Sequence, residues 1–195
     1  MVFKTALFLI TTIFLISCTS LEIQQPIQQE VAESTTWVSE MKLTSPAFTE
    51  GGKIPSKYTC DGQNINPPLQ FSDVPKGAQA LVLIMDDPDI PDFAKQKFNI
   101  EVWDHWVIFN IPADTREIPE GKNPPGKLGR NTGGNNTYGG PCPPDREHRY
   151  FFKLYALDAE LELPEGATKA EVEKVMKNHV LAEAKLMGMY ERVSK

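Results

Sequence analysis

The sequence predicts a mostly β domain with short helices near its C-terminus. Two apolar runs, residues 80–85 and 105–111, are bounded by turn-forming residues and have the length of strands rather than helices. A third strand is expected from His148, directly after a proline-rich loop. Helical spacing of apolar residues is convincing only after Thr168. Strands followed by late helices indicate one mostly β fold with appended helices.

Composition limits the function classes. The chain has 195 residues, of which 41% are hydrophobic, and this is enough for the core of one domain. Its formal net charge of -6 and the lack of clustered Lys and Arg exclude a nucleic-acid partner. No glycine-rich dinucleotide or phosphate-loop motif is present, so no nucleotide cofactor is expected.

The N-terminus has the pattern of an export signal. Lys4 precedes an apolar run over residues 6–16, about half the ~20 residues that a membrane-spanning helix needs. The tetrapeptide at residues 15–18 resembles a bacterial lipobox, which predicts a lipoprotein signal peptide over residues 1–17 and lipidation of Cys18. The alternative is an ordinary signal peptide in which Cys18 has no role. Both place the protein outside the cytoplasm, and the first attaches it to a membrane of the cell envelope, on its periplasmic or outer surface.

A linker separates this signal from the domain. Residues 18–37 are rich in Gln, Glu, Ser and Thr and have few large apolar side chains, so they cannot offset the entropy of ordering. We expect a disordered tether there, and a folded domain over residues 38–195 whose first short strand covers residues 41–43.

The run at residues 80–85 is predicted to be a strand that is buried on both faces. It leads into the carboxylates Asp86, Asp87 and Asp89, a grouping that we do not expect to serve stability. A semi-ordered excursion is expected over residues 92–104.

Two further strands begin with histidine. His105 opens the strand over residues 105–111, and His148 opens another, in which Tyr150 shares its face because side chains alternate. Residues 118–140 are rich in Gly, Asn and Pro and are expected to form a long loop.

The C-terminal region is predicted to contain a helix pair. Thr168 and Glu171 have the spacing of a capping box, and Asn178 is expected to separate this first helix from a second over residues 180–187. Gly188 would end the second helix, and a short strand would close the chain. His179 is interpreted as a packed, hydrogen-bonded residue of the helix stripe and is left out of the site.

The polar residues at the strand ends suit one kind of ligand. If these ends meet, Asp87, Asp89, His105, His148 and Tyr150 form a small polar pocket in an apolar wall. Imidazole and phenol groups can donate hydrogen bonds to phosphate or carboxylate oxygens, and an aspartate behind a histidine favours its charged form. This combination indicates an anion-binding pocket.

Several segments together resemble the phosphatidylethanolamine-binding protein family, also called the Raf kinase inhibitor protein family. They are residues 87–91 (DPDIP), 105–106 (HW), 140–144 (GPCPP) and 148–150 (HRY), while residues 58–62, 110–114 and 181–192 resemble its prokaryotic branch. The resemblance covers residues 43–192. It implies a β-sandwich with short helices and one pocket for anionic groups such as phospholipid head groups, phosphate or acetate. The implied ligand-binding residues are Asp87, His105, Gly140, Pro141, His148 and Tyr150, with Asp89 and Pro91 at the edge.

The sequence departs from the family pattern at two places. Arg146 stands where a glycine is common, two residues before the histidine of the HRY motif, and would bring a cation to the rim or alter the turn. The excursion over residues 92–104 is longer than expected. Both departures concern the entrance of the pocket.

The same residue types also occur in metal sites and in nucleophilic catalysis. A metal site built from Asp87, Asp89, His105 and His148 lacks the usual ligand spacings, so no metal is expected. A Cys142–His148 nucleophile pair lacks an activating helix N-terminus. Because Cys60 and Cys142 remain once Cys18 is lipidated, and export favours oxidation, a disulfide between them is expected.

The sequence therefore predicts a non-enzymatic, membrane-anchored binding protein without a cofactor, whose ligand is a small anion or a phospholipid head group. The alternative, which the resemblance implies, is an inhibitor or regulator of another protein. For an exported chain, a protease or another envelope protein is the expected target. A hydrolase acting through His148 and Asp87 has no further support in the sequence.

Overall fold

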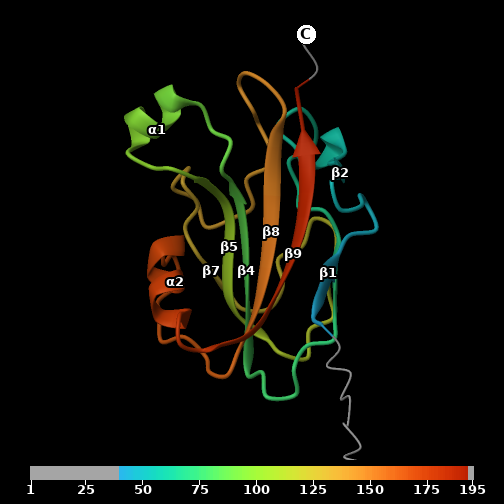
Figure 1. The fold of residues 1–195 in the computed structure, drawn as a ribbon, viewed down its shortest axis with the longest axis vertical. Coiled ribbons are helices and arrows are strands. Elements are labelled where there is room, and N and C mark those ends of the chain that lie inside the picture. The colour runs from blue at the N-terminus through green and yellow to red at the C-terminus, as the bar shows by residue number, and fades with distance from the viewer. Residues whose placement is uncertain (1–39, 193–195) are drawn as a thin grey trace, which may run out of the picture. The chain divides into compact units, whose positions relative to one another are not determined.

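The computed structural model describes residues 40–192, which form two β-sheets and two short α-helices (Figure 1). The predicted signal peptide, lipidation site, tether and domain start at residue 38 lie outside the described residues. The strands are β1 (Lys42–Thr44), β2 (Gly52–Lys53), β3 (Leu69–Ser72), β4 (Ala80–Asp87), β5 (Trp103–Pro112), β6 (Glu117–Ile118), β7 (Lys127–Leu128), β8 (His148–Leu157) and β9 (Val180–Tyr190). The helices are the 3₁₀ turn η1 (Ser56–Tyr58), α1 (Asp92–Phe98) and α2 (Lys169–Met176).

The larger sheet has the strand order β2-β9-β8-β4-β5-β7, and the smaller has the order β1-β3-β6. Antiparallel partners β5 and β8 flank β4, so the end of β4 and the starts of both neighbours lie at one edge of the sheet. Figure 1 shows α1 beyond this end of the sheet and α2 beside the sheet, near β7. The predicted meeting of strand ends is therefore confirmed for these three strands.

Apolar side chains cover both faces of β4, and every residue of this strand is buried, as predicted. On one face, Leu83 and Met85 belong to a core cluster that includes residues of the smaller sheet, such as Phe71. On the other face, Ile84 belongs to a second cluster that includes Val172 of α2. Within residues 40–192, no helix is long and apolar enough to cross a membrane.

The prediction of a second C-terminal helix over residues 180–187 is wrong, because this segment is strand β9. β9 pairs with β8 from His148 opposite Tyr190 to Leu157 opposite Val180. The buried residues near its end alternate, Ala184, Leu186 and then Gly188, and this strand period outweighs the helix propensity of Ala, Glu, Lys and Leu. Gly188 ends no helix. A Cβ atom there would lie 2.5 Å from Ile54 Cγ1, so the glycine permits close packing.

The first helix of the predicted pair is confirmed as α2. Thr168 and Glu171 form the capping box, in which the Thr168 amide donates to Glu171 Oε2 at 2.8 Å. His179 lies after this helix rather than on its apolar face. Its side chain is 42% exposed and hydrogen-bonded to Asp158, so the packed position predicted for it is wrong while the hydrogen bond is present.

The segment over residues 92–104 is more ordered than predicted. Its first part is helix α1, which follows Pro91 and ends where Asn99 adopts a left-handed conformation (φ 53°). Phe93 and Phe98 of this helix stay exposed, with 62% and 44% of their surfaces accessible.

Candidate anion-binding pocket

His148 lies at the centre of the polar residues that meet at this sheet edge. It is fully buried, and its Nδ1 is 2.7 Å from Oδ2 of Asp87, the last residue of β4. The other carboxylate oxygen of Asp87 accepts the backbone N–H of Asp89 at 2.7 Å. Burial raises the pKa of Asp87, against the opposing effect of the His148 hydrogen bond. Asp87 thus fixes the orientation of the imidazole and directs Nε2 away from the β4 strand end.

Asp145 is bound to this outward nitrogen. Its Oδ1 lies 2.8 Å from His148 Nε2, and 42% of its side chain is exposed. Both ring nitrogens of His148 therefore face carboxylate oxygens, which accept hydrogen bonds from ring N–H groups. The hydrogen bond to His148 holds the pKa of Asp145 below its usual range.

His105 has the opposite hydrogen-bonding character. Its Nδ1 lies 2.7 Å from the carbonyl oxygen of Gly139, which can only accept, so Nδ1 carries the proton. Burial lowers the pKa of His105 to about 4. At neutral pH its Nε2 is therefore an acceptor, and the donor role predicted for this residue is wrong for that nitrogen.

Tyr150 lies between the two histidines. Its ring centroid is 5.3 Å from that of His105 and 6.4 Å from that of His148. Among residues 40–192, its buried hydroxyl has no hydrogen-bond partner of ordinary geometry, although the backbone N–H of Cys142 approaches it. Burial raises the pKa of Tyr150, so the hydroxyl keeps its proton. A buried donor without an acceptor is costly and is often satisfied by a ligand.

A pocket of about 400 Å³ opens over these residues. Its polar lining includes Asp87, His105 and His148, and its apolar walls come mainly from α1 and the prolines of the loop before β8. The lining residues are Asp87, Ile90, Pro91, Phe93, Ala94, Phe98, Trp103, His105, Asn131, Gly133, Asn135, Gly139, Gly140, Cys142, Pro143, Pro144 and His148. Of the predicted ligand-binding residues, Asp89, Pro141 and Tyr150 do not line it.

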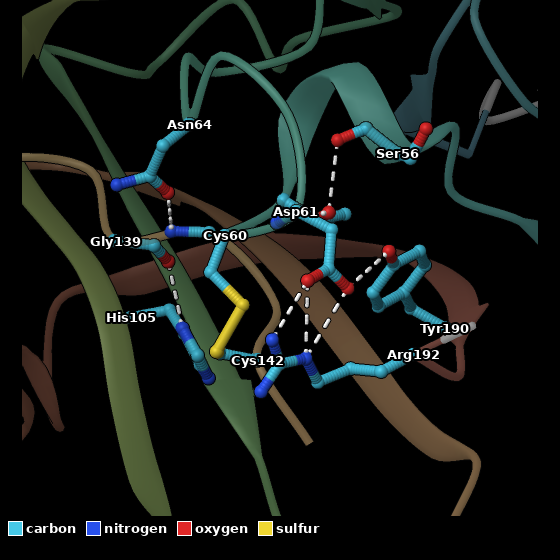
Figure 2. The surroundings of a disulfide bond; sticks show 11 residues. Ser56, Cys60, Asp61, Asn64, His105, Gly139, Cys142, Tyr190 and Arg192 are labelled. Carbon is cyan, nitrogen blue, oxygen red and sulfur yellow. Dashed lines mark hydrogen bonds and ion pairs between the residues drawn. A yellow bond between two sulfur atoms is a disulfide. The ribbon is translucent and has the colours of Figure 1, made fainter. Parts of the chain in front are cut away.

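The loop before β8 is fastened to the loop after η1. Cys60 and Cys142 form the expected disulfide, which Figure 2 shows beside His105 and Gly139. The Cys60 N–H also donates to the Pro141 carbonyl at 3.1 Å. A Cβ atom on Gly140 would lie 2.5 Å from the Tyr58 carbonyl oxygen, so only glycine allows this approach. The disulfide also removes the thiol that a Cys142–His148 nucleophile pair would need.

The carboxylates near the end of β4 have separate roles. Asp86 accepts from Lys153 at 2.7 Å and from Lys169 at 2.8 Å, so it is part of an ion-pair network. Asp89 binds Arg149 through two side-chain hydrogen bonds, of 2.7 and 2.8 Å. The prediction that this grouping does not serve stability is therefore wrong for Asp86 and Asp89, and only Asp87 contacts a pocket histidine.

Of the two effects expected of Arg146, the structure places its cation beside Asp89 and Asp145, in a hollow next to the pocket rather than among the pocket-lining residues. Its guanidinium donates to the Asp89 carbonyl oxygen at 3.1 Å and lies 3.7 Å from the Asp145 carboxylate. Among the described residues, the non-glycine positions with positive φ do not include Arg146, so the turn does not require a glycine here.

The Asp89–Arg149 contact predicts an acid-sensitive contribution to stability. Hydrogen bonds from Arg149 lower the pKa of Asp89 from 3.8 to about 2, so the folded state favours the ionised carboxylate. This contribution is complete above pH 4 and is lost as the pH falls toward 2. Because Arg149 is half exposed, we expect Asp89→Asn to lower the free energy of unfolding by only about 1 kcal/mol at pH 7. Urea unfolding at several pH values measures this difference.

The matched control is Asp114→Asn, which removes an exposed aspartate from the turn after β5. It is expected to leave stability within about 0.5 kcal/mol of wild type. An Asp89→Asn deficit that stays constant from pH 7 to pH 3 would contradict the assignment.

Comparison with known proteins identifies the family and the fold. A family model described as Phosphatidylethanolamine-binding protein matches residues 44–191. The chain belongs to this family. A UPF0098 protein of Methanothermobacter thermautotrophicus is 51% identical over 158 residues, covering 78% of this chain and 99% of that relative. A UPF0098 protein of Chlamydia pneumoniae is 45% identical over 152 residues, covering 78% and 99%.

Two crystal structures of the phosphatidylethanolamine-binding protein family have the same fold. A putative homolog from Chlamydia trachomatis is 45% identical, with a TM-score of 0.75, and the match covers 79% of this chain and 99% of that one. YbcL of E. coli, described as a new member of the mammalian family, is 29% identical, with a TM-score of 0.71, and the match covers 80% and 100%. The mostly β fold expected from the resemblance is therefore confirmed.

Sequence reasoning missed one hydrogen-bond partner of a pocket residue and one pocket wall. The partner is Asp145, and its spacing of three residues from His148 across a turn is the available signal. Helix α1, which supplies Phe93, Ala94 and Phe98, was expected to be semi-ordered, and the pairing of aromatic residues at its two ends was the available signal.

Proposed function

We propose that this protein is a non-enzymatic, lipid-anchored extracytoplasmic binding protein whose pocket takes a small phosphate- or carboxylate-bearing ligand, such as a phospholipid head group. One observation carries the proposal. His148 is buried, is oriented by Asp87, and already has a carboxylate 2.8 Å from its Nε2. A nitrogen that hydrogen-bonds one carboxylate has the position and direction to hydrogen-bond the oxygen of another anion.

Two further groups limit which hydrogen-bonding groups the ligand must carry. The Tyr150 hydroxyl lies behind the lining, next to the two histidines, and is a buried donor that a ligand oxygen entering between their rings would satisfy. His105 presents an acceptor nitrogen at neutral pH. A ligand that fits both combines an anionic oxygen with a hydrogen-bond donor, as monohydrogen phosphate or a phosphoethanolamine head group does. The apolar walls, including Phe93 and Trp103, suit carbon atoms attached to the charged group.

The absence of catalysis and the location of the protein are part of the proposal. The residues supply hydrogen-bonding groups without an activated nucleophile, since the one cysteine beside His148 is in a disulfide. The lipobox-like residues 15–18 support export and a lipid anchor. The polar residues 18–37 would then join this anchor to the folded domain as a flexible linker.

Isothermal titration calorimetry with phosphate, phosphoethanolamine and acetate tests the pocket. Tyr150→Phe removes only the buried hydroxyl and is expected to weaken phosphate binding about tenfold, the loss of one hydrogen bond to an anion. Tyr138→Phe is the matched control, because the Tyr138 hydroxyl donates to the Tyr58 carbonyl at 2.8 Å and is already satisfied. It should change affinity less than twofold. Unchanged affinity in Tyr150→Phe would count against this hydroxyl as a ligand contact.

A further inference from the structure

Asp145 holds the ring nitrogen that the proposed ligand needs. Its carboxylate is 2.8 Å from His148 Nε2, the outward nitrogen of a fully buried imidazole. His148 has only two ring nitrogens, and Asp87 holds the other at 2.7 Å. A ligand anion can therefore reach His148 only if the Asp145 carboxylate leaves.

Asp145 has little else to hold it there. Its side chain is 42% exposed, and its other polar contacts among the described residues are with Arg146, whose backbone N–H approaches the carboxylate and whose guanidinium is 3.7 Å away and 57% exposed. The contrast with Asp87 is clear, because only 4% of the Asp87 side chain is exposed and both of its oxygens accept hydrogen bonds. Asp87 is built into the fold, whereas Asp145 reaches the site from the surface.

The loop that carries Asp145 is anchored on both sides of it. Cys142 is bonded to Cys60 on one side, and Pro143 and Pro144 restrict the backbone that follows. On the other side, Arg149 is tied to Asp89 by paired hydrogen bonds. The Asp145 carboxylate is therefore kept close to His148 at a high effective concentration, while its exposed side chain can rotate into solvent.

We propose that Asp145 is an intramolecular competitor for the anion site, occupying His148 when the pocket is empty and yielding to a ligand. The inference rests on the proposed function, and it adds a rule for specificity. Acetate offers the same carboxylate as Asp145 without its tether, so it competes poorly. A phosphate group has further oxygens for the Tyr150 hydroxyl and a proton for His105 Nε2, so it competes better.

The test compares acetate and phosphate binding to the purified full-length chain by calorimetry, for wild type, Asp145→Ala and Glu147→Gln. Asp145→Ala is expected to bind acetate at least about tenfold more tightly than wild type, because the tethered competitor is gone. Glu147→Gln is the matched control, since it removes a negative charge from the same loop at a residue that pairs with Lys53 rather than with His148. Its affinities are expected to stay within twofold of wild type.

The outcomes distinguish failure of the Asp145 competitor proposal from failure of the proposed anion-binding function. Equal anion affinities in wild type and Asp145→Ala would overturn the competitor and leave the anion pocket standing. An equal gain in Glu147→Gln would also overturn it, because general charge would then explain the effect. Failure of both wild type and Asp145→Ala to bind acetate or phosphate would overturn the proposed function, and the competitor with it. Thermal unfolding of each variant verifies that the proteins compared are folded.

Discussion

Replacing His148 by alanine is expected to abolish anion binding, with phosphate affinity at least about 100-fold below wild type. In the proposed pocket the imidazole donates to the anion through Nε2, and a hydrogen bond to a charged group contributes about 1.5–3 kcal/mol. The substitution also leaves the Asp87 carboxyl buried without its partner. Burial raises the pKa of Asp87, so the carboxyl can take up a proton, which lessens the cost of the lost partner. We therefore expect the free energy of unfolding to fall by about 3 kcal/mol, at the low end for a broken buried pair.

His148→Asn separates binding from folding. The asparagine amide can donate to Asp87 from a position near that of Nδ1, but it has no group in the place of Nε2. We expect about 1 kcal/mol of destabilisation, measured by urea unfolding, with anion binding as weak as in His148→Ala. Wild-type phosphate affinity in folded His148→Asn would refute the assignment of Nε2 as the ligand donor.

Loss of the Cys60–Cys142 disulfide is expected to cost about 4 kcal/mol of unfolding free energy. The bond joins residues 82 positions apart, and closing a loop of that length restricts the unfolded chain by about this amount. For a domain of this size, the melting temperature should fall by roughly 8–16 °C. Both cysteines are exposed, so a thiol reductant can reach them. Calorimetric melting with and without reductant measures the effect.

The control is the double variant Cys60→Ser, Cys142→Ser, which should melt at the lower temperature with or without reductant. A difference below about 1 kcal/mol between oxidised and reduced wild type would contradict a main role for the bond in stability. In that case the contacts around it, including the ion pair of Asp61 with Arg192 in Figure 2, would suffice to hold the loop.

Strand prediction succeeded where the pattern was unambiguous. The buried strand β4 was evident from a short apolar run ending in acidic residues, and β8 from the alternation that begins at His148. β9 was misread because residues 180–187 have helical propensity, and only pairing along the whole of β8 decides their conformation. Long-range pairing of this kind is not contained in a local window of sequence.

The candidate site was predictable in its residues but not in its contacts. Strand ends placed Asp87, His105 and His148 together, because antiparallel neighbours share an edge. Hydrogen bonding then divided their roles in ways that residue type cannot reveal. The Gly139 carbonyl makes His105 an acceptor at Nε2, and the turn after Pro144 brings Asp145 onto His148.

The most direct test of the anion pocket is nitrogen-15 NMR of the imidazole rings during a phosphate titration. The chain has three histidines, and His179, hydrogen-bonded to Asp158 near the opposite end of β8, serves as an internal control. We predict saturable shifts of the His148 ring nitrogens, smaller shifts of His105, and none of His179. Unchanged His148 resonances at phosphate concentrations that saturate calorimetric binding would contradict the account.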